Sequence, residues 1–201
     1  METVVVLRRR GQLTFFCVKN ANPVSLGLGT AAAALLCLFA AACGSSQPAA
    51  AQANKTVFDH FTIGVGGHPA SLQVAVSEAE QERGLMQRPD LGGDDGMLFV
   101  YAEPQSLSIW MRNTPEPLDL AYLTEDGAVA EVYSLLPLDE RPVTSHTGEM
   151  QYALEMPKGW LASHGVRVGD RIDLKAVAAA LKDRGFDPAK YRLGRDLPAP
   201  Q

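Results

Sequence analysis

The chain has 201 residues, of which 46% are hydrophobic and 20% charged, and its formal net charge is −5 at pH 7. This composition is typical of a globular protein and excludes a fully disordered one. Residues 57–174 hold 7 Lys and Arg against 19 Asp and Glu, a net charge of −12. We therefore expect no nucleic-acid partner, because phosphate binding needs a cationic face.

The first 43 residues have the pattern of an export signal. No residue between Lys19 and Lys55 is charged, residues 24–42 are almost wholly apolar or small, and a basic run at residues 8–10 precedes them. A basic flank, an apolar stretch and then small residues is the order of a secretory signal peptide. We predict that residues 1–43 are a leader and that the rest of the chain is exported to the cell envelope.

The end of this leader resembles a bacterial lipobox. Cys43 follows three alanines and precedes Gly44, although Ala40 stands where the usual motif has Leu. Lipidation of Cys43 would anchor the chain to a membrane, facing the periplasm or the exterior. Cleavage at an Ala-x-Ala site, giving a soluble periplasmic protein, and an uncleaved anchor of about 20 residues are the alternatives. No cysteine follows Cys43, so the exported part has no disulfide framework.

Residues 44–56 are mostly Ser, Ala, Gln and Pro and predict a flexible tether. Alternating residues at 61–65 and 71–76, separated by Gly-Gly-His-Pro, then predict a β-hairpin. Ser77 with a Glu three residues later is a capping box, which opens a helix that we expect to end near residue 87, before Pro89.

The remaining segments predict more short strands and few helices. We expect strands at residues 96–101, 107–111, 118–123, 128–135, 151–156 and 171–174, a helical turn at 158–164 and a helix at 176–182. Many short strands with two or three small helices predict a mainly β (α+β) domain over residues 57–174, built as a compact barrel-like or strongly curved antiparallel sheet. Residues 175–201 would form a short helix and a mobile tail.

A series of motifs runs through this domain in a fixed order. They are Arg83-Gly-Leu-Met86, Gly96-Met-Leu-Phe99, Trp110-Met-Arg-Asn-Thr114, Pro117-Leu-Asp119, Leu154-Glu155, Gly159 and Val168-Gly-Asp170. The chain resembles the domain of unknown function 192 family over roughly residues 61–174. It departs from the usual pattern at Ile109, Arg112 and Glu116. The resemblance implies a compact β-rich fold and no catalytic residues, because none are established for the family.

Polar and aromatic residues gather at one strand end and its proline-rich loop: Trp110, Arg112, Asn113 and Asp119. Alternate residues of a strand share a face, so Trp110 and Arg112 can point together if the strand extends that far. A flat aromatic face beside planar donors suits a sugar, a carboxylate or a peptide. The structural alternative is an Arg112–Asp119 salt bridge that holds the loop, with Trp110 in the core.

Three further charged residues have two interpretations each. Arg88 could join Arg112 as an anion-binding pair, or cap the predicted helix while Arg83 pairs with a nearby glutamate. Glu155 lies in an otherwise apolar strand. It could be the buried partner of one of these arginines or the lone carboxylate of a binding site.

We expect no metal or cofactor. The histidines His60, His68, His146 and His164 lack ligand spacing, and Asp94-Asp95 lacks the acidic ladder of a calcium loop. No nucleophile elbow or dinucleotide fingerprint is present.

Three hypotheses of function follow. The first is a non-enzymatic accessory domain that binds a small polar ligand or an envelope protein through Arg88, Trp110, Arg112, Asn113, Asp119 and Glu155. The second is an enzyme that acts on small envelope substrates such as glycans, with Asp119 or Glu155 as acid or base. The third is a structural lipoprotein domain that packs on a partner.

Overall fold

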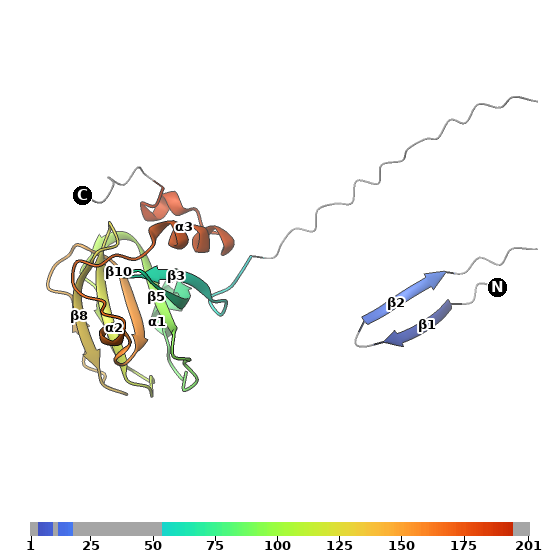
Figure 1. Ribbon diagram of the computed structural model, residues 1–201, viewed down its shortest axis with the longest axis horizontal. Helices are drawn as coiled ribbons and strands as arrows, with labels where there is room; N and C mark the ends of the chain where they lie inside the picture. Colours follow the sequence, from blue (N-terminus) through green and yellow to red (C-terminus); the bar gives the residue numbers. More distant parts are fainter. Residues whose placement is uncertain (1–3, 10–11, 18–53, 195–201) are drawn as a thin grey trace, which may run out of the picture. The chain divides into compact units, whose positions relative to one another are not determined.

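The computed structural model describes residues 4–9, 12–17 and 54–194 of the chain (Figure 1). The chain divides into two compact units, Met1–Ala49 and Ala50–Gln201. In the first unit, β1 (Val4–Arg9) and β2 (Gln12–Cys17) pair as an antiparallel hairpin. The predicted lipidation site Cys43 and the apolar stretch before it lie outside the described residues. Within the described ranges, no helix is long and apolar enough to cross a membrane.

A six-stranded sheet with the order β3-β4-β5-β10-β7-β8 forms the second unit. Its strands are β3 (Phe61–Val65), β4 (His68–Ala75), β5 (Asp95–Gln105), β7 (Leu118–Thr124), β8 (Val129–Leu135) and β10 (Met150–Pro157). The mainly β prediction is confirmed, but the sheet is mixed and is not closed into a barrel. It is mixed because β4 and β5 pair in parallel, which requires the crossover through α1 that joins them.

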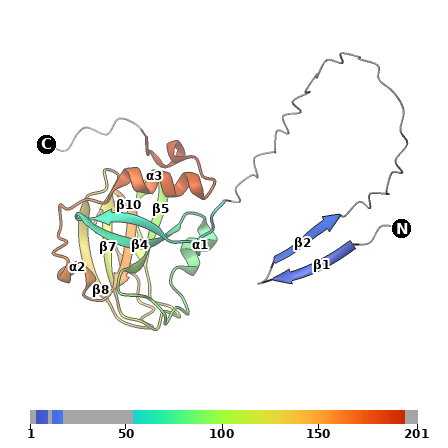
Figure 2. The same ribbon diagram turned by 45° about the vertical axis from the view of Figure 1, so that its right-hand side comes forward.

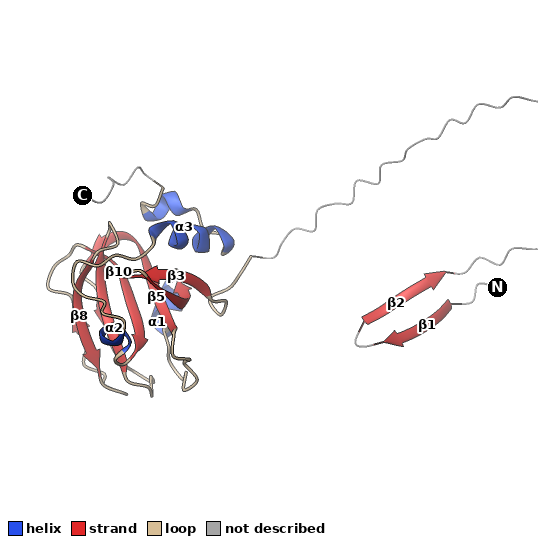
Figure 3. Cartoon of the chain, in the orientation of Figure 1, coloured by secondary structure: helices blue, strands red, loops and turns tan. Residues whose placement is uncertain are grey.

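Short helices and one small second sheet surround these strands (Figure 3). They are α1 (Glu78–Arg83), β6 (Ser108–Ile109), β9 (Val143–Thr144), α2 (Trp160–Ser163), α3 (Leu174–Asp183) and the 3₁₀ helix η1 (Pro188–Tyr191). The predicted strand at 107–111 is reduced to β6, which pairs with β9. The segment predicted as a strand at 171–174 makes only isolated bridges before Asp173 caps α3.

The sheet is buried on both faces. Nearly every residue of β7 and β10 is buried, and successive strand residues point to opposite faces, so both faces are covered. On the α3 face, Leu98 and Leu154 join the core that includes Val177 and Leu181 of α3. On the α1 face, a second core includes residues 97, 99 and 120 of the sheet, together with Leu85 from the loop after α1.

The packed unit extends beyond Leu174. Val177, Ala180 and Leu181 of α3 and Leu193 after η1 are all buried in the core of the α3 face. Figure 2 shows α3 beside β3 and β4, and α3 contacts β3. Residues 174–194 therefore belong to the same fold as the strands.

Candidate functional site

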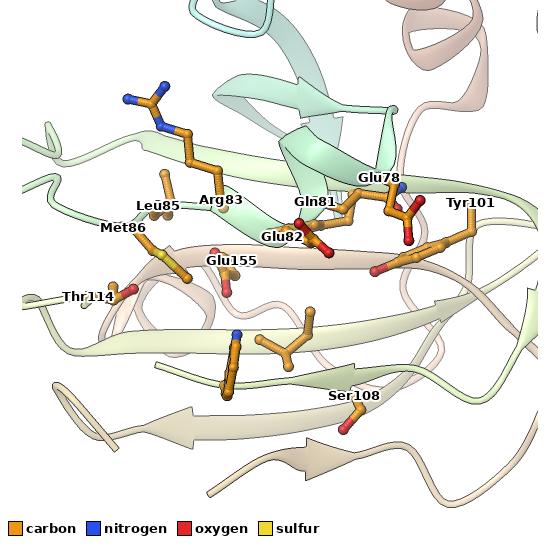
Figure 4. Close-up of a pocket in the computed structure, with 14 residues that line it drawn as sticks. Glu78, Gln81, Glu82, Arg83, Leu85, Met86, Tyr101, Ser108, Thr114 and Glu155 are labelled. Atoms are coloured by element: carbon orange, nitrogen blue, oxygen red, sulfur yellow. The ribbon is translucent and has the colours of Figure 1, made fainter. Parts of the chain in front are cut away.

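A cavity of about 320 Å³ lies between α1 and the α1 face of the sheet, and we call it the α1 cavity (Figure 4). Its lining residues come from three parts of the fold: Glu78, Gln81, Glu82, Arg83, Gly84, Leu85 and Met86 of α1 and its following loop; Phe99, Tyr101 and Glu155 of the sheet; and Ser108, Ile109, Trp110 and Thr114 opposite α1.

The cavity exists because α1 does not pack tightly on the sheet. None of its residues is buried, since its sequence from Glu78 to Arg83 contains a single apolar residue, an alanine. The helix is held at its edges instead. Gln81 Nε2 donates to the carbonyl of Val100 at 3.0 Å, and Glu80 Oε1 pairs with Arg184 Nη2 at 2.5 Å.

The helix ends at Arg83, with Gly84 as its C-cap, rather than near residue 87. Gly84 has φ of +48°, and a Cβ atom there would come within 3.3 Å of the Phe99 ring. A glycine therefore suits both the backbone conformation and the close approach to the sheet. The chain then turns so that Leu85 enters the core while Met86 lines the cavity.

Glu155 supplies a buried carboxyl group to the wall of the α1 cavity. The residue is only 4% exposed, and its Oε2 atom has no hydrogen-bond partner within the described part of the chain. Its neighbours across the sheet are Met97 on β5 and Leu120 on β7. Because these apolar side chains exclude water, burial raises the pKa of Glu155 to about 8. The carboxyl is mostly protonated at neutral pH.

No arginine approaches Glu155 within ion-pair distance among residues 54–194. The expectation that Glu155 is the buried partner of an arginine is therefore wrong for this fold. The buried ion pair is formed elsewhere, between Glu80 and Arg184. Tyr101, which lines the same cavity, has its pKa raised to about 12 by burial and by the charge of Glu155.

Trp110 and Arg112 lie together at the side of the cavity opposite α1. Trp110 is 43% exposed, and the Arg112 guanidinium stands 5.4 Å from the centre of its ring, a cation–π distance. The common orientation predicted for these two residues is what the structure has. The alternative with Trp110 in the core and Arg112 paired with Asp119 is wrong.

Asn113 joins the Trp110 loop to the loop after α1. It has φ of +54°, its carbonyl accepts from Gln87 N at 2.8 Å, and its Nδ2 lies 4.0 Å from Met86 Sδ. Asparagine tolerates the left-handed region better than most residues. Asn113 therefore shapes the border of the cavity but does not line it.

Asp119 lies on the opposite face of the sheet from Glu155. It pairs in register with Met156, whose side chain is in the core of the α3 face, whereas Glu155 pairs with Leu120 of the α1 face. Asp119 Oδ2 accepts from the backbone nitrogens of Gly159 at 2.8 Å and Leu161 at 3.4 Å. It fixes the start of α2 and takes no part in the cavity.

Arg88 also lies apart from the cavity. Its Nη1 donates to Gln73 Oε1 at 3.1 Å and its Nε to Asp90 Oδ1 at 2.7 Å. It lines a separate hollow of about 230 Å³ with Phe58 and Met97. Arg88 is engaged by Gln73 and Asp90, whereas the Arg112 guanidinium lies over the Trp110 ring, so each of the two predicted partners has other contacts.

Of the six residues predicted for a site, the cavity is lined by Trp110 and Glu155. The prediction missed its other polar members, chiefly Glu78, Gln81, Glu82 and Tyr101. One signal was available: a short helix with almost no apolar residue cannot fill the space above a sheet. Within the described ranges, no group of three or more His, Cys, Asp or Glu is arranged to hold a metal ion.

Residues 61–174 match the DUF192 family, described as "Uncharacterized ACR". A crystal structure from Sinorhizobium meliloti 1021, described as a proposed transcription regulator, is 29% identical, with a TM-score of 0.55 over 59% of this chain and 96% of that one. A protein of unknown function from Novosphingobium aromaticivorans DSM 12444 is 33% identical, with a TM-score of 0.52 over 57% and 83%. Curated proteins yield no match. The chain belongs to the domain of unknown function 192 family.

Proposed function

We propose that this domain is a non-enzymatic binding module that takes a small organic ligand into the α1 cavity. The observation that carries the proposal is Glu155: a buried, unpartnered carboxyl group in the wall of a cavity of about 320 Å³. A buried polar group without a partner costs about 1–3 kcal/mol. A ligand that supplies the missing partner recovers that free energy on binding.

The lining of the cavity also favours binding. Apolar surface from Phe99 and Trp110 lies among more numerous polar groups, so the lining offers both packing surface and hydrogen-bond partners to a small polar ligand. Trp110 is partly exposed, so its ring is available to a ligand at the border of the cavity. The −12 charge of residues 57–174 does not favour DNA as the ligand, despite the description of the S. meliloti relative.

Acid–base hydrolysis of glycans is the less favoured function. That chemistry needs two carboxylates roughly 5–10 Å apart on the two sides of one bond. Asp119 and Glu155 point to opposite faces of the sheet, so this pair cannot flank a substrate. The partner-packing hypothesis has no comparable feature to support it.

We further propose that the binding domain acts at the cell envelope, exported by residues 1–43 and anchored through a lipid on Cys43. The uncharged apolar leader and the small residues around Cys43 support this. Mass spectrometry of the mature N-terminus tests it. Diacylglyceryl-Cys43 is the expected first residue, and an unmodified N-terminus after Cys43 would exclude the anchor.

Binding itself can be followed by tryptophan fluorescence. The chain has two tryptophans, Trp110 beside the cavity and the buried Trp160 on the other face of the sheet. In the full chain carrying Trp160→Phe, emission therefore reports on Trp110. We expect at least one class among monosaccharides, amino acids and small amines to shift this emission in a saturable way. If none of the three classes does so, the proposed function is wrong.

A further inference from the structure

We propose that the ligand of the α1 cavity is an organic cation, an ammonium group on a short apolar or aromatic body, whose charge pairs with Glu155. This inference rests on the proposed binding function and names its ligand class. Three features of the cavity support it: the signs of its charges, the unpartnered Glu155 carboxyl, and its aromatic lining.

The charged groups around the cavity are mostly acidic. Glu78 and Glu82 line it together with the protonated Glu155, and the one cationic residue among its lining is Arg83. The Arg112 guanidinium lies next to the lining, over the Trp110 ring. Figure 4 shows the Arg83 guanidinium pointing away from Glu155, while Glu78 and Glu82 lie toward Tyr101. The guanidinium stands 5.0 Å from the Phe58 ring. The interior therefore favours a positive ligand over a negative one.

Glu155 gives this acidic surface a specific anchor. It is more than nine-tenths buried, lines the cavity, and has an oxygen with no partner within residues 54–194. An ammonium group placed there would form a charge-assisted hydrogen bond in a region of low dielectric, where such bonds are strong. A neutral hydroxyl would satisfy the carboxyl but gain less, because it brings no charge to the hydrogen bond.

Aromatic side chains complete the site. Phe99, Tyr101 and Trp110 line the cavity, and aromatic faces attract cations electrostatically. Arg112 already lies over the Trp110 ring, so Phe99 and Tyr101 are the other aromatic residues of the lining that could contact a ligand cation. A volume of about 320 Å³ is at the lower end of the range for ligand sites, which limits the ligand to a small amine.

Binding exchanges a proton for the ligand charge. Glu155 is protonated in the empty cavity near neutral pH, because burial raises its pKa to about 8. When an ammonium ion enters, the carboxyl loses its proton to the buffer and the ion pair forms. The other titratable and charged groups that line the cavity are Glu78, Glu82, Arg83 and Tyr101.

The test compares three probes of one shape and different charge: benzylammonium, benzyl alcohol and benzoate. Each is titrated into the full chain by calorimetry at pH 6.5 and pH 9, in buffers of different ionisation enthalpy, and into the full chain carrying Trp160→Phe by Trp110 fluorescence. We expect benzylammonium to bind at least about tenfold more tightly than the alcohol, a difference typical of a charge-assisted bond. It should release close to one proton at pH 6.5 and almost none at pH 9.

Variants separate the anchor from general charge effects. Glu155→Gln keeps a neutral side chain of the same shape and should abolish both the preference for the amine and the proton release. Glu82→Gln, at an exposed position of the lining, should weaken amine binding about two- to threefold, the size of a surface charge effect. Glu149→Gln, exposed and outside the cavity lining, is the control and should change nothing.

The outcomes distinguish this inference from the binding function beneath it. If the alcohol or benzoate binds as tightly as the amine while shifting Trp110 emission, the cavity binds ligands but the cation assignment is wrong. Amine binding without proton release, or unaltered in Glu155→Gln, would also overturn the assignment. If none of the three probes shifts Trp110 emission, the cation assignment is wrong for the α1 cavity. The proposed binding function is then decided by the titrations with monosaccharides, amino acids and other small amines.

Discussion

At the scale of single residues, the two acidic groups in the central strands have opposite roles. Asp119 accepts hydrogen bonds from two backbone nitrogens at the start of α2, so its charge is used within the fold. Glu155 has no such partner for Oε2 in the part of the chain that the structure describes. A residue that costs stability without an evident structural gain is expected at functional sites.

The first prediction concerns Glu155 and pH. Its folded pKa of about 8 lies above its ordinary 4.5, so the folded state binds the extra proton. The associated stability is therefore present below pH 4.5 and is lost as pH rises toward 8, by an amount on the order of a few kcal/mol. Glu155→Gln should remove this loss, and chemical unfolding of both proteins at pH 5 and pH 8.5 measures it. An unchanged pH dependence in the variant would show that Glu155 is not the group responsible.

At the scale of elements, α1 is held in place by hydrogen bonds and an ion pair and not by buried apolar side chains. The capping box of Ser77 and Glu80 opens the helix, and Glu80 also pairs with Arg184, whose side chain is 4% exposed. Burial alone would raise the pKa of Glu80, but hydrogen bonds from Arg184 and from the backbone of Val76 and Ser77 hold it below its usual value. One residue therefore connects α1 to the end of α3.

The second prediction concerns the loss of the ion pair between Glu80 and Arg184. Arg184→Met keeps most of the side-chain volume but leaves Glu80 without its partner, so we expect the free energy of unfolding to fall by about 2–4 kcal/mol. Urea unfolding at pH 7 measures the loss. The double variant Arg184→Met/Glu80→Gln is the control and should recover part of the stability, because it leaves no unpaired charge. A double variant less stable than the single one would contradict this role.

At the scale of the whole molecule, one sheet with two covered faces separates the α1 cavity from the core of the α3 face. The α3 face is closed by α3 and residue 193 after η1, and the α1 face holds the cavity. If the α1 cavity binds the proposed ligand, this division predicts that stability and binding can be changed independently. Strong destabilisation from the α3 face should leave binding in the folded fraction unaltered.

The third prediction tests whether α3 is integral to the domain. Leu181 is fully buried in the core of the α3 face, so Leu181→Ala should cost about 2–5 kcal/mol. Unfolding should remain a single transition by both far-UV circular dichroism and Trp110 fluorescence in the Trp160→Phe background. A separate early transition in the helical signal alone would mean that α3 folds as an appendage.

Local sequence patterns were enough to predict several secondary-structure elements, the mainly β fold class and the family of this protein. The hairpin at residues 61–75, the capping box at Ser77 and the mainly β composition depend on neighbours in the chain, and the ordered motifs placed it in its family. Trp110 and Arg112 do lie together, but in the loop after β6 and not on one strand face, because the strand ends at Ile109.

The tertiary structure decided the rest. Which face Asp119 and Glu155 occupy relative to each other depends on the register between β7 and β10. That register is set by the packing of whole strands, because a shift of one residue reverses every side chain. Likewise, Glu80 meets Arg184 across 104 positions of sequence, and the α1 cavity forms only where a polar helix crosses a complete sheet. The expected localisation of the protein follows from the sequence of residues 1–43 alone. Its expected ligand follows from tertiary contacts that no local sequence pattern encodes.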